Sequence, residues 1–225
     1  MKLKILAILT FVSMVFALYM IFIVAPREST QGDAQRIFYL HVPLATFGYV
    51  GAFLLGFGSI RYLMTRDSKW DRLGHAAAEV TVAFITAQLI TGSLWARPIW
   101  GPWWVWDART TMQVVLYLIF IAYLMLREFV PEGPKRAILS AVFGLLAMID
   151  VPINYLSIYL FRTQHPQAVV SPGGGGLLDP DMSKAFFASF VAVTLLFIYL
   201  LNRRLAIARV EEEINYLEQI VLAHE

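Results

Sequence analysis

The sequence predicts an all-α integral membrane protein with six transmembrane helices, from its composition and its hydropathy pattern. Of the 225 residues, 59% are hydrophobic and only 15% are charged, and the mean hydropathy is +0.64. Soluble domains are nearer half apolar and a quarter charged. Six apolar runs are also long enough to cross the hydrocarbon core, which takes about 20 residues of helix. Together these observations indicate a multi-pass helical membrane protein.

The expected spans are residues 3–25, 43–65, 76–96, 110–127, 137–161 and 185–201. The first follows MKLK and could be taken for a signal peptide. Its apolar run exceeds the roughly 7–15 residues of a signal peptide, and no clear A-x-A cleavage site follows it. We therefore expect a true span, and one six-span domain over residues 1–201.

The remaining residues, 202–225, form a predicted tail with a regular apolar pattern. Five apolar residues recur at 3-4-3-4 spacing: Ile207, Val210, Ile214, Leu217 and Val221. This pattern is typical of one face of a helix, but two heptads are too short to establish a coiled coil. We expect an amphipathic cytoplasmic helix that lies against the membrane or a partner subunit.

The distribution of basic residues orients the chain in the membrane. Six spans place both termini on one side. Twelve Lys and Arg residues lie on that side: Lys2, Lys4, Arg61, Arg66, Lys69, Arg72, Arg127, Lys135, Arg136, Arg203, Arg204 and Arg209. Six lie on the other: Arg27, Arg36, Arg97, Arg109, Arg162 and Lys184. The positive-inside rule then predicts cytoplasmic termini and an external loop between the third and fourth spans.

This predicted external face carries the residues with recognisable binding chemistry. Residues 100–109 read WGPWWVWDAR, and His41 and His165 lie on the same face, whereas His75 and His224 are cytoplasmic. Imidazole is a good ligand for transition metals, and haem iron accepts one or two axial histidines. Indole rings would suit a flat apolar macrocycle whose carboxylates pair with arginine. Four arginines are on the correct side: Arg36, Arg97, Arg109 and Arg162.

A plainer interpretation of the same residues stays open. Trp is favoured at the membrane interface, and a single His there needs no ligand. Four tryptophans within seven residues are denser than anchoring requires, and Gly101 and Pro102 indicate a shaped turn. These residues alone do not decide between a membrane anchor and a ring-binding platform.

Several functions are excluded or disfavoured by what the chain lacks. It has no cysteine, which excludes disulfides, thiol catalysis, zinc–thiolate sites and covalent c-type haem attachment. A net charge of +2 gives no reason to expect a nucleic-acid partner.

The external segment 162–184 contains SPGGGGLLDPD, which we interpret as a flexible lid or linker and not as a phosphate loop, because no GK[ST] follows.

Polar residues within the spans are few. Asp150 and Asn154 flank Pro152 in the fifth span. An ionisable group at membrane depth suggests function, but we favour a structural role, in which Asp150 satisfies backbone groups freed by a Pro152 kink. Glu79 begins the third span near the cytoplasm, where we expect a helix-start residue beside the headgroups.

The Trp-rich segment resembles the "WWD" signature of haem-handling membrane proteins. The pattern W-G-x-x-W-x-W-D-x-R corresponds to Trp100, Gly101, Trp103 or Trp104, Trp106, Asp107 and Arg109. The six-span size and the segments QRIFYLHVP, DSKWDRL, TGSLWARPIWG and TQHPQ extend this resemblance to the haem exporter protein C (CcmC) family of bacterial system I cytochrome c maturation. One departure is Met112, where the family commonly has a small hydroxyl residue.

The resemblance implies non-covalent binding of haem b at the external face of the bacterial inner membrane. It implies His41 and His165 as axial iron ligands, with the signature residues and Arg36 around the ring. It further implies transfer of the haem to a membrane-anchored periplasmic haem chaperone. The implied partners include the ATPase and membrane subunits of an ABC transporter and a small single-span subunit. This chain has no ATP-binding motif, so the implied role is binding and transfer and not enzymatic catalysis.

Three other functions remain to be compared with this one. A small membrane cytochrome b for electron transfer would normally hold its haem between histidines within the spans. A transporter needs a polar path across the membrane, for which only Glu79, Gln88, Asp150 and Asn154 are available. The larger system II synthetase component shares the signature but has more spans and intramembrane histidines.

Overall fold

Six long helices dominate the part of the chain described by the structure, a computed structural model that covers residues 2–161, 163, 165 and 179–223. They are α1 (Lys2–Tyr19), α2 (Phe38–Thr65), α3 (Ser68–Trp100), α4 (Ala108–Phe129), α5 (Pro134–Leu160) and α6 (Pro180–Ala223). A π-helical turn, η1 (Met20–Val24), extends α1, and a 3-10 turn, η2 (Asp33–Ile37), precedes α2. Within these described residues, six helical segments are long and apolar enough to cross a membrane, which confirms the predicted all-α membrane fold.

The helices extend beyond the apolar runs from which they were predicted. Helix α3 begins at Ser68, eight residues before the expected span, because Asp67 caps its N-terminus by accepting the backbone N–H of Lys69 at 3.0 Å. Helix α6 continues unbroken to Ala223 and includes most of the expected tail. Hydropathy detects only the lipid-buried part of a helix, so polar extensions are missed.

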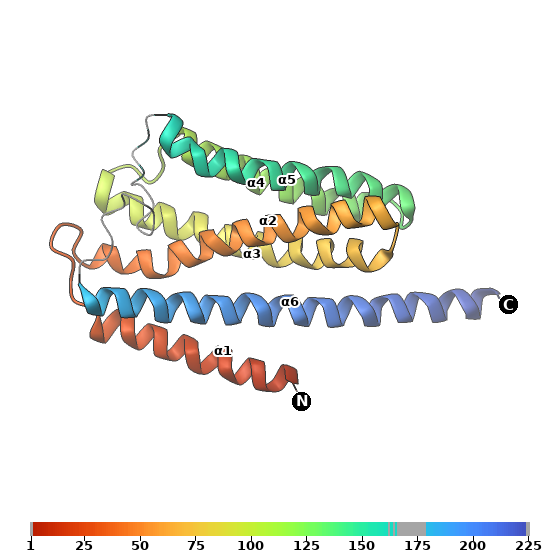
Figure 1. Ribbon diagram of the computed structural model, residues 1–225, viewed down its shortest axis with the longest axis horizontal. Helices are drawn as coiled ribbons and strands as arrows, with labels where there is room; N and C mark the ends of the chain where they lie inside the picture. Colours follow the sequence, from red (N-terminus) through yellow and green to blue (C-terminus); the bar gives the residue numbers. More distant parts are fainter. Residues whose placement is uncertain (1, 162, 164, 166–178, 224–225) are drawn as a thin grey trace.

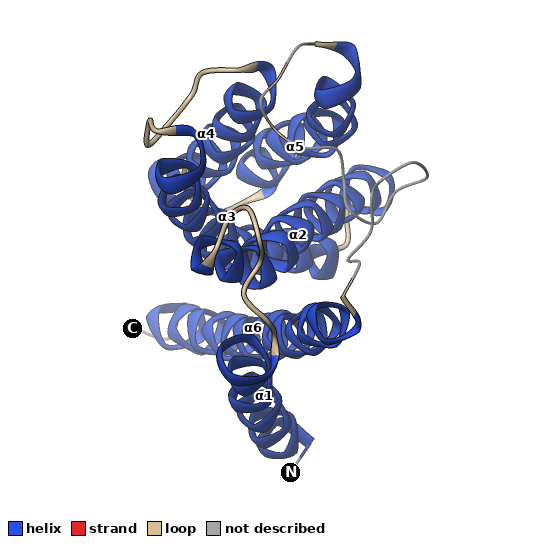
Figure 2. Ribbon diagram, turned by 90° about the vertical axis from the view of Figure 1, so that its left-hand side faces the viewer, coloured by secondary structure: helices blue, strands red, loops and turns tan. Residues whose placement is uncertain are grey.

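The helices form a four-helix bundle with a flanking pair (Figures 1 and 2). Helices α2, α3, α4 and α5 make the bundle, α6 packs along α2 and α3, and α1 packs against α6 on the side away from the bundle. Helix α1 runs from the N-terminus toward the end of the molecule that holds the loop between α3 and α4, and α6 runs from that end to the C-terminus. This arrangement agrees with an even number of spans.

Small residues let α2 approach its neighbours closely. A Cβ atom added to Gly51 of α2 would lie 1.7 Å from Thr81 Oγ1 of α3, and one added to Gly144 of α5 would lie 2.1 Å from Ser59 Oγ of α2. Such contacts stabilise helix pairs in membranes, where lipid is as apolar as the side chains and close packing must supply the attraction. They join α2 to α3 and to α5.

The expected external lid, residues 162–184, is only partly described. Residues 162, 164 and 166–178 lie outside the described part, so its glycine-rich segment is not assessed, nor are Arg162 and His224. From Pro180 onward the segment is helical and forms the first turn of α6.

Candidate functional site

A cavity of about 1050 Å³ lies at the end of the bundle where the loop joins α3 to α4. Its walls come from the first turns of α2 and α6, the last turns of α3 and α5, the start of α4, and the loops before α2 and α4. Ligand sites in proteins usually measure about 300–1,000 Å³. This cavity is therefore large enough for a bulky ligand.

Both histidines that the sequence assigned to the external face line this cavity. His41 is in the first turns of α2, and His165 is in the segment between α5 and α6. His75 lies at the opposite end, where its Nε2 is 3.7 Å from Glu79 Oε1. The fold thus brings together two histidines that are far apart in sequence and separates them from a third.

The imidazole of His41 is held by α3. Its Nδ1 lies 3.1 Å from Thr91 Oγ1, and the Thr91 hydroxyl donates to the carbonyl of Ala87 at 2.8 Å. The threonine oxygen is then free to accept the Nδ1–H of His41, and this tautomer places the lone pair on Nε2. Gly92 makes room for the ring, since a Cβ atom there would lie 3.0 Å from Cε1 of His41. Trp95 meets the same ring edge-on at 5.7 Å.

The imidazole of His165 is held in a similar way by a carboxylate. Its Nδ1 lies 3.3 Å from Asp107 Oδ2, and its backbone N–H donates to Thr163 Oγ1 at 3.1 Å. The Thr163 hydroxyl donates to the same Asp107 carboxylate. The carboxylate beside Nδ1 again favours the tautomer that carries its hydrogen on Nδ1 and its lone pair on Nε2. A hydrogen-bonded partner at the second ring nitrogen is the usual way in which proteins orient a metal-binding histidine and increase its basicity.

Asp107 also starts helix α4. Its Oδ1 accepts the backbone N–H of Thr110 at 2.9 Å, and Thr110 Oγ1 accepts the backbone N–H of Asp107 at 3.1 Å, which completes a capping box. Burial alone would raise the pKa of this carboxyl, but the Thr110 N–H, the Thr163 hydroxyl and His165 outweigh it and lower the pKa to about 2. The carboxylate is therefore charged at physiological pH.

The protonation state of His165 follows from the same contacts. Burial lowers its pKa below the usual 6.5, while the charge and hydrogen bond of Asp107 act in the opposite direction, and burial dominates. The imidazole is therefore neutral at pH 7, the form that a metal ion requires.

The Trp-rich signature divides into lining and non-lining residues. Trp100, Trp103 and Trp104 line the cavity, and the Trp100 ring lies 5.3 Å from the His165 ring. Gly101 ends α3 with a φ of +93°, a conformation that favours glycine, and is not among the lining residues. Trp106 does not line the cavity either; it is 71% exposed.

The arginines expected around the site also divide. Arg109 lines the cavity and donates to the backbone carbonyl of Asn154 at 2.8 Å. Arg36 does not line it: its guanidinium donates to the carbonyls of Ile21 and Ala25, at the end of η1. Arg97 is not a lining residue either; it donates to the carbonyl of Gly101, and its Cζ lies 5.8 Å from the centroid of the Trp103 ring.

Asn154 connects the cavity wall to the interior of the bundle. It is completely buried, and its Nδ2 donates to Gln113 Oε1 at 3.1 Å. The Tyr49 hydroxyl donates to Asn154 Oδ1 at 3.1 Å. Asp150, one turn earlier on α5, is also buried but is not a lining residue, and its Oδ2 has no hydrogen-bond partner among the described residues. These contacts give Asn154 a structural role under the site.

Several residues of the cavity wall were not expected from the sequence. Trp95, Gln35 and Arg27 line it, and so does Gln88, considered above only for a transport path. Helical spacing could have identified two of them, because positions 88, 92 and 95 share one face of a helix. Three of the lining residues each have a buried side-chain atom without a hydrogen-bond partner in the described part of the chain: Gln35 Oε1, Gln88 Oε1 and Trp104 Nε1. Buried polar atoms are normally paired, so these three are exceptions in the wall of the cavity.

Comparison with known proteins gives consistent matches. A family profile described as "Heme exporter protein C" matches residues 1–219. A protein of Bradyrhizobium diazoefficiens named "Heme exporter protein C" is 34% identical over 176 residues, which are 78% of this chain and 67% of that protein. A "cytochrome c biosynthesis ccmC-like mitochondrial protein" of Marchantia polymorpha is 30% identical over 194 residues, 85% of this chain and 82% of that protein. "Heme exporter protein C" of Escherichia coli K12 is 32% identical over 145 residues, 63% of this chain and 58% of that protein.

Proposed function

The chain belongs to the haem exporter protein C family, and from this premise we propose that it binds haem b in the cavity and passes it on during cytochrome c maturation. The observation that carries the proposal is the pair of histidines on one cavity. Each has its Nδ1 engaged, by Thr91 for His41 and by Asp107 for His165. Each therefore offers Nε2 as an axial ligand for one haem iron.

The other lining residues suit the rest of the haem. The indole rings of Trp100, Trp103 and Trp104 supply flat apolar surface for the macrocycle. Arg109 and Arg27 line the same cavity and supply positive charge for the two carboxylates. The wall therefore combines apolar rings with two cations, which suits a ligand that is apolar over most of its surface and anionic at its edge.

Binding is non-covalent in this proposal. The chain contains no cysteine, so the thioether bonds of c-type haem cannot form. Iron coordination and ring contacts then provide the affinity, and both can be reversed, as a carrier of haem requires.

The two proposed ligands differ in how firmly they are held. His41 belongs to α2 and is fixed against α3 by Thr91 and Gly92. His165 lies outside the helices, in the segment between α5 and α6. Moving a residue outside regular structure disrupts less packing than moving a helix. We therefore assign His165 as the ligand that leaves the iron first during transfer.

The proposed recipient is a membrane-anchored periplasmic haem chaperone. Trp106 and Trp103 are 71% and 56% exposed beside the cavity and together offer an apolar rim for such a partner. We further propose that the chain works in the bacterial inner membrane, with the cavity facing the periplasm. Its other proposed partners are the ATPase and membrane subunits of an ABC transporter and a small single-span subunit.

Electron transfer fits the geometry less well than transfer of haem. Both histidines lie at one end of the bundle, where His165 is in a segment outside the helices and its side chain is 29% exposed. A haem held there is accessible to a partner, whereas a cytochrome b normally encloses its haem between helices.

The function can be tested in a bacterial strain that lacks its own haem exporter protein C. Wild-type protein should restore covalent haem on the chaperone, measured by haem staining of membranes. His41→Ala and His165→Ala should not restore it at equal protein levels. A double variant that loads the chaperone as well as wild type would contradict the proposal. Phe129→Ala, an exposed change at the opposite end, is a control that should retain full loading.

A further inference from the structure

Helix α6 is much longer than a membrane is thick. It has 44 residues, or about 66 Å at 1.5 Å per residue, whereas a bilayer with its headgroups measures about 40–45 Å. Figure 1 shows it running straight past the other helices to the C-terminus. Its last turns therefore project into water, on the side that the basic residues identify as cytoplasmic.

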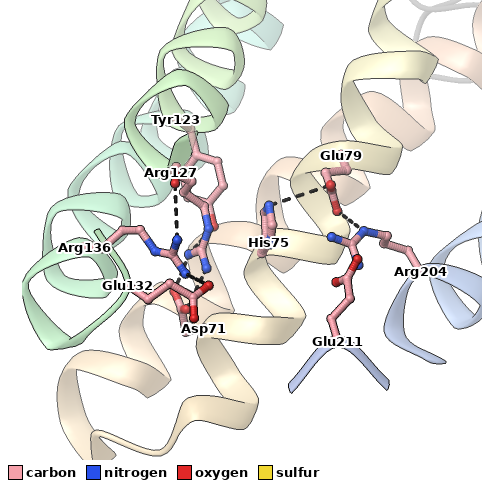
Figure 3. A network of polar contacts seen from close by, with 9 residues as sticks. All are labelled: Asp71, His75, Glu79, Tyr123, Arg127, Glu132, Arg136, Arg204 and Glu211. Carbon is pink, nitrogen blue, oxygen red and sulfur yellow. Dashed lines mark hydrogen bonds and ion pairs between the residues drawn. The ribbon is translucent and has the colours of Figure 1, made fainter. Parts of the chain in front are cut away.

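Ion pairs hold this projecting tail in a fixed direction as it leaves the bundle. Arg204 of α6 pairs with Glu79 of α3, and also with Glu211 on its own helix at 2.9 Å (Figure 3). Further along, Glu212 of α6 pairs with Arg72 of α3. A helix fixed at its base loses less freedom when it binds a partner, so the tail is preorganised for binding.

The tail carries an apolar stripe that begins at the membrane surface and continues into water. Its five residues are each 45–59% exposed: Ile207, Val210, Ile214, Leu217 and Val221. Their 3-4-3-4 spacing places them on one face, as the a and d positions of a coiled-coil seam. No neighbouring helix among the described residues covers this stripe. A continuous apolar stripe in water is typical of an interaction surface.

Charge along the stripe distinguishes between possible occupants. The seam is flanked at e and g positions by Glu211, Glu213 and Glu218. Glu211 is already paired with Arg204, which leaves Glu213 and Glu218. In a parallel pair of identical tails, Glu213 would face Glu218, so this arrangement brings acids together. The membrane is also unsuitable, because the tail points away from the membrane.

We propose that the tail stripe binds an amphipathic α-helix of a partner protein on the same side of the membrane, with Lys or Arg residues flanking the apolar seam of that helix. The apolar residues of the two helices interlock, and the basic flanks pair with Glu213 and Glu218. This site is separate from the cavity and does not depend on what the cavity binds.

The proposal can be tested on the full chain in detergent with two synthetic 21-residue helical peptides. Both carry Leu and Ile at the a and d positions; one has Lys and the other has Glu at e and g. In fluorescence anisotropy, the basic peptide should bind at least about tenfold more tightly than the acidic one. The Lys residues of the basic peptide attract the glutamates of the tail, whereas the Glu residues of the acidic peptide repel them. Binding should weaken with added salt.

Variants locate the binding surface. Ile214→Asp and Leu217→Asp should each weaken binding of the basic peptide by about tenfold or more, whereas Arg209→Ala, outside the seam, should not change it. Glu213→Lys combined with Glu218→Lys should reverse the preference, so that the acidic peptide binds better. This gain of binding cannot arise from misfolding.

Several results would overturn the proposal. They are equal binding of the two peptides, no binding of either, binding unchanged by Leu217→Asp, or no reversal in the charge-swapped variant. Self-association of the wild-type chain that Leu217→Asp abolishes, seen by sedimentation, would instead assign the stripe to a second copy.

Discussion

The carboxylate of Asp107 contacts the imidazole of His165 on a segment far along the chain, with Oδ2 and Nδ1 3.3 Å apart. The same carboxylate caps α4 through the backbone N–H of Thr110. The aspartate of the Trp-rich signature thereby links the start of α4 to the histidine that we propose as an iron ligand. We interpret it as a positioning residue that acts on haem through His165.

Replacing Asp107 with asparagine tests this role. Asn still caps a helix well, so α4 should begin at the same place, but the charge that orients the imidazole is lost. Loss of such a partner typically weakens metal affinity by about 10–100-fold, and we expect a similar loss in a haem titration. Asp67→Asn, the same change at the N-cap of α3, should bind haem as wild type does. Equal haem affinity in wild type and Asp107→Asn would contradict the assigned role.

The pKa of His165 in the haem-free protein gives a second test. Burial lowers this pKa below 6.5, and Asp107 partly offsets the effect. Removing the carboxylate charge in Asp107→Asn should therefore lower the pKa further. NMR of ¹³C-labelled histidines over pH 4–8 can follow the titration, with the resonance assigned by His165→Ala. A wild-type pKa above 6.5, or a rise in Asp107→Asn, would show that the contacts differ from those described.

The tryptophans should separate into two functional groups. Trp104 lines the cavity, so Trp104→Ala should lower haem occupancy in the purified protein. Trp106 is 71% exposed and does not line it, so Trp106→Ala should keep its haem but load the chaperone more slowly. Optical spectra and haem staining measure the two steps separately. If Trp106→Ala lost haem as readily as Trp104→Ala, the rim would belong to the binding site itself.

The buried ion pair at the end of the bundle opposite the cavity should stabilise the fold. Arg127 of α4 makes two hydrogen bonds with Asp71 of α3, of 2.7 and 2.9 Å (Figure 3), and the Arg127 side chain is 8% exposed. Removing one partner of a buried pair leaves an unpaired charge and typically costs about 3–5 kcal/mol. We expect this loss in the free energy of unfolding of Asp71→Asn in mixed micelles.

An exposed ion pair provides the control for that measurement. Lys184 and Asp181 lie 2.8 Å apart, but the Lys184 side chain is 66% exposed. Lys184→Met should therefore leave the free energy of unfolding nearly unchanged, because water screens an exposed ion pair. If Asp71→Asn changed it no more than Lys184→Met does, the Asp71–Arg127 pair would not stabilise the fold.

The fold was predictable because apolar runs directly report segments that cross a membrane. The polar extensions of α3 and α6 could not be predicted in this way, since only the segments in contact with lipid need to be apolar. His41 and His165 could be expected to lie near one another because the predicted topology places both on the external face. Contacts such as Thr91 with His41 depend on how each helix is rotated against its neighbour, which a single sequence does not specify. The same limit explains why Arg36 was expected at the cavity. Its guanidinium instead donates to the carbonyl of Ala25, just after η1.

The central claim is that one haem iron is held between His41 and His165, and electron paramagnetic resonance of the purified ferric protein tests it most directly. Wild type should give the low-spin signal of iron with two imidazole ligands. His41→Ala and His165→Ala should each convert it to a high-spin signal with a single imidazole, and the double variant should lose haem. A high-spin wild type, or a low-spin signal that persists unchanged in the double variant, would contradict the claim.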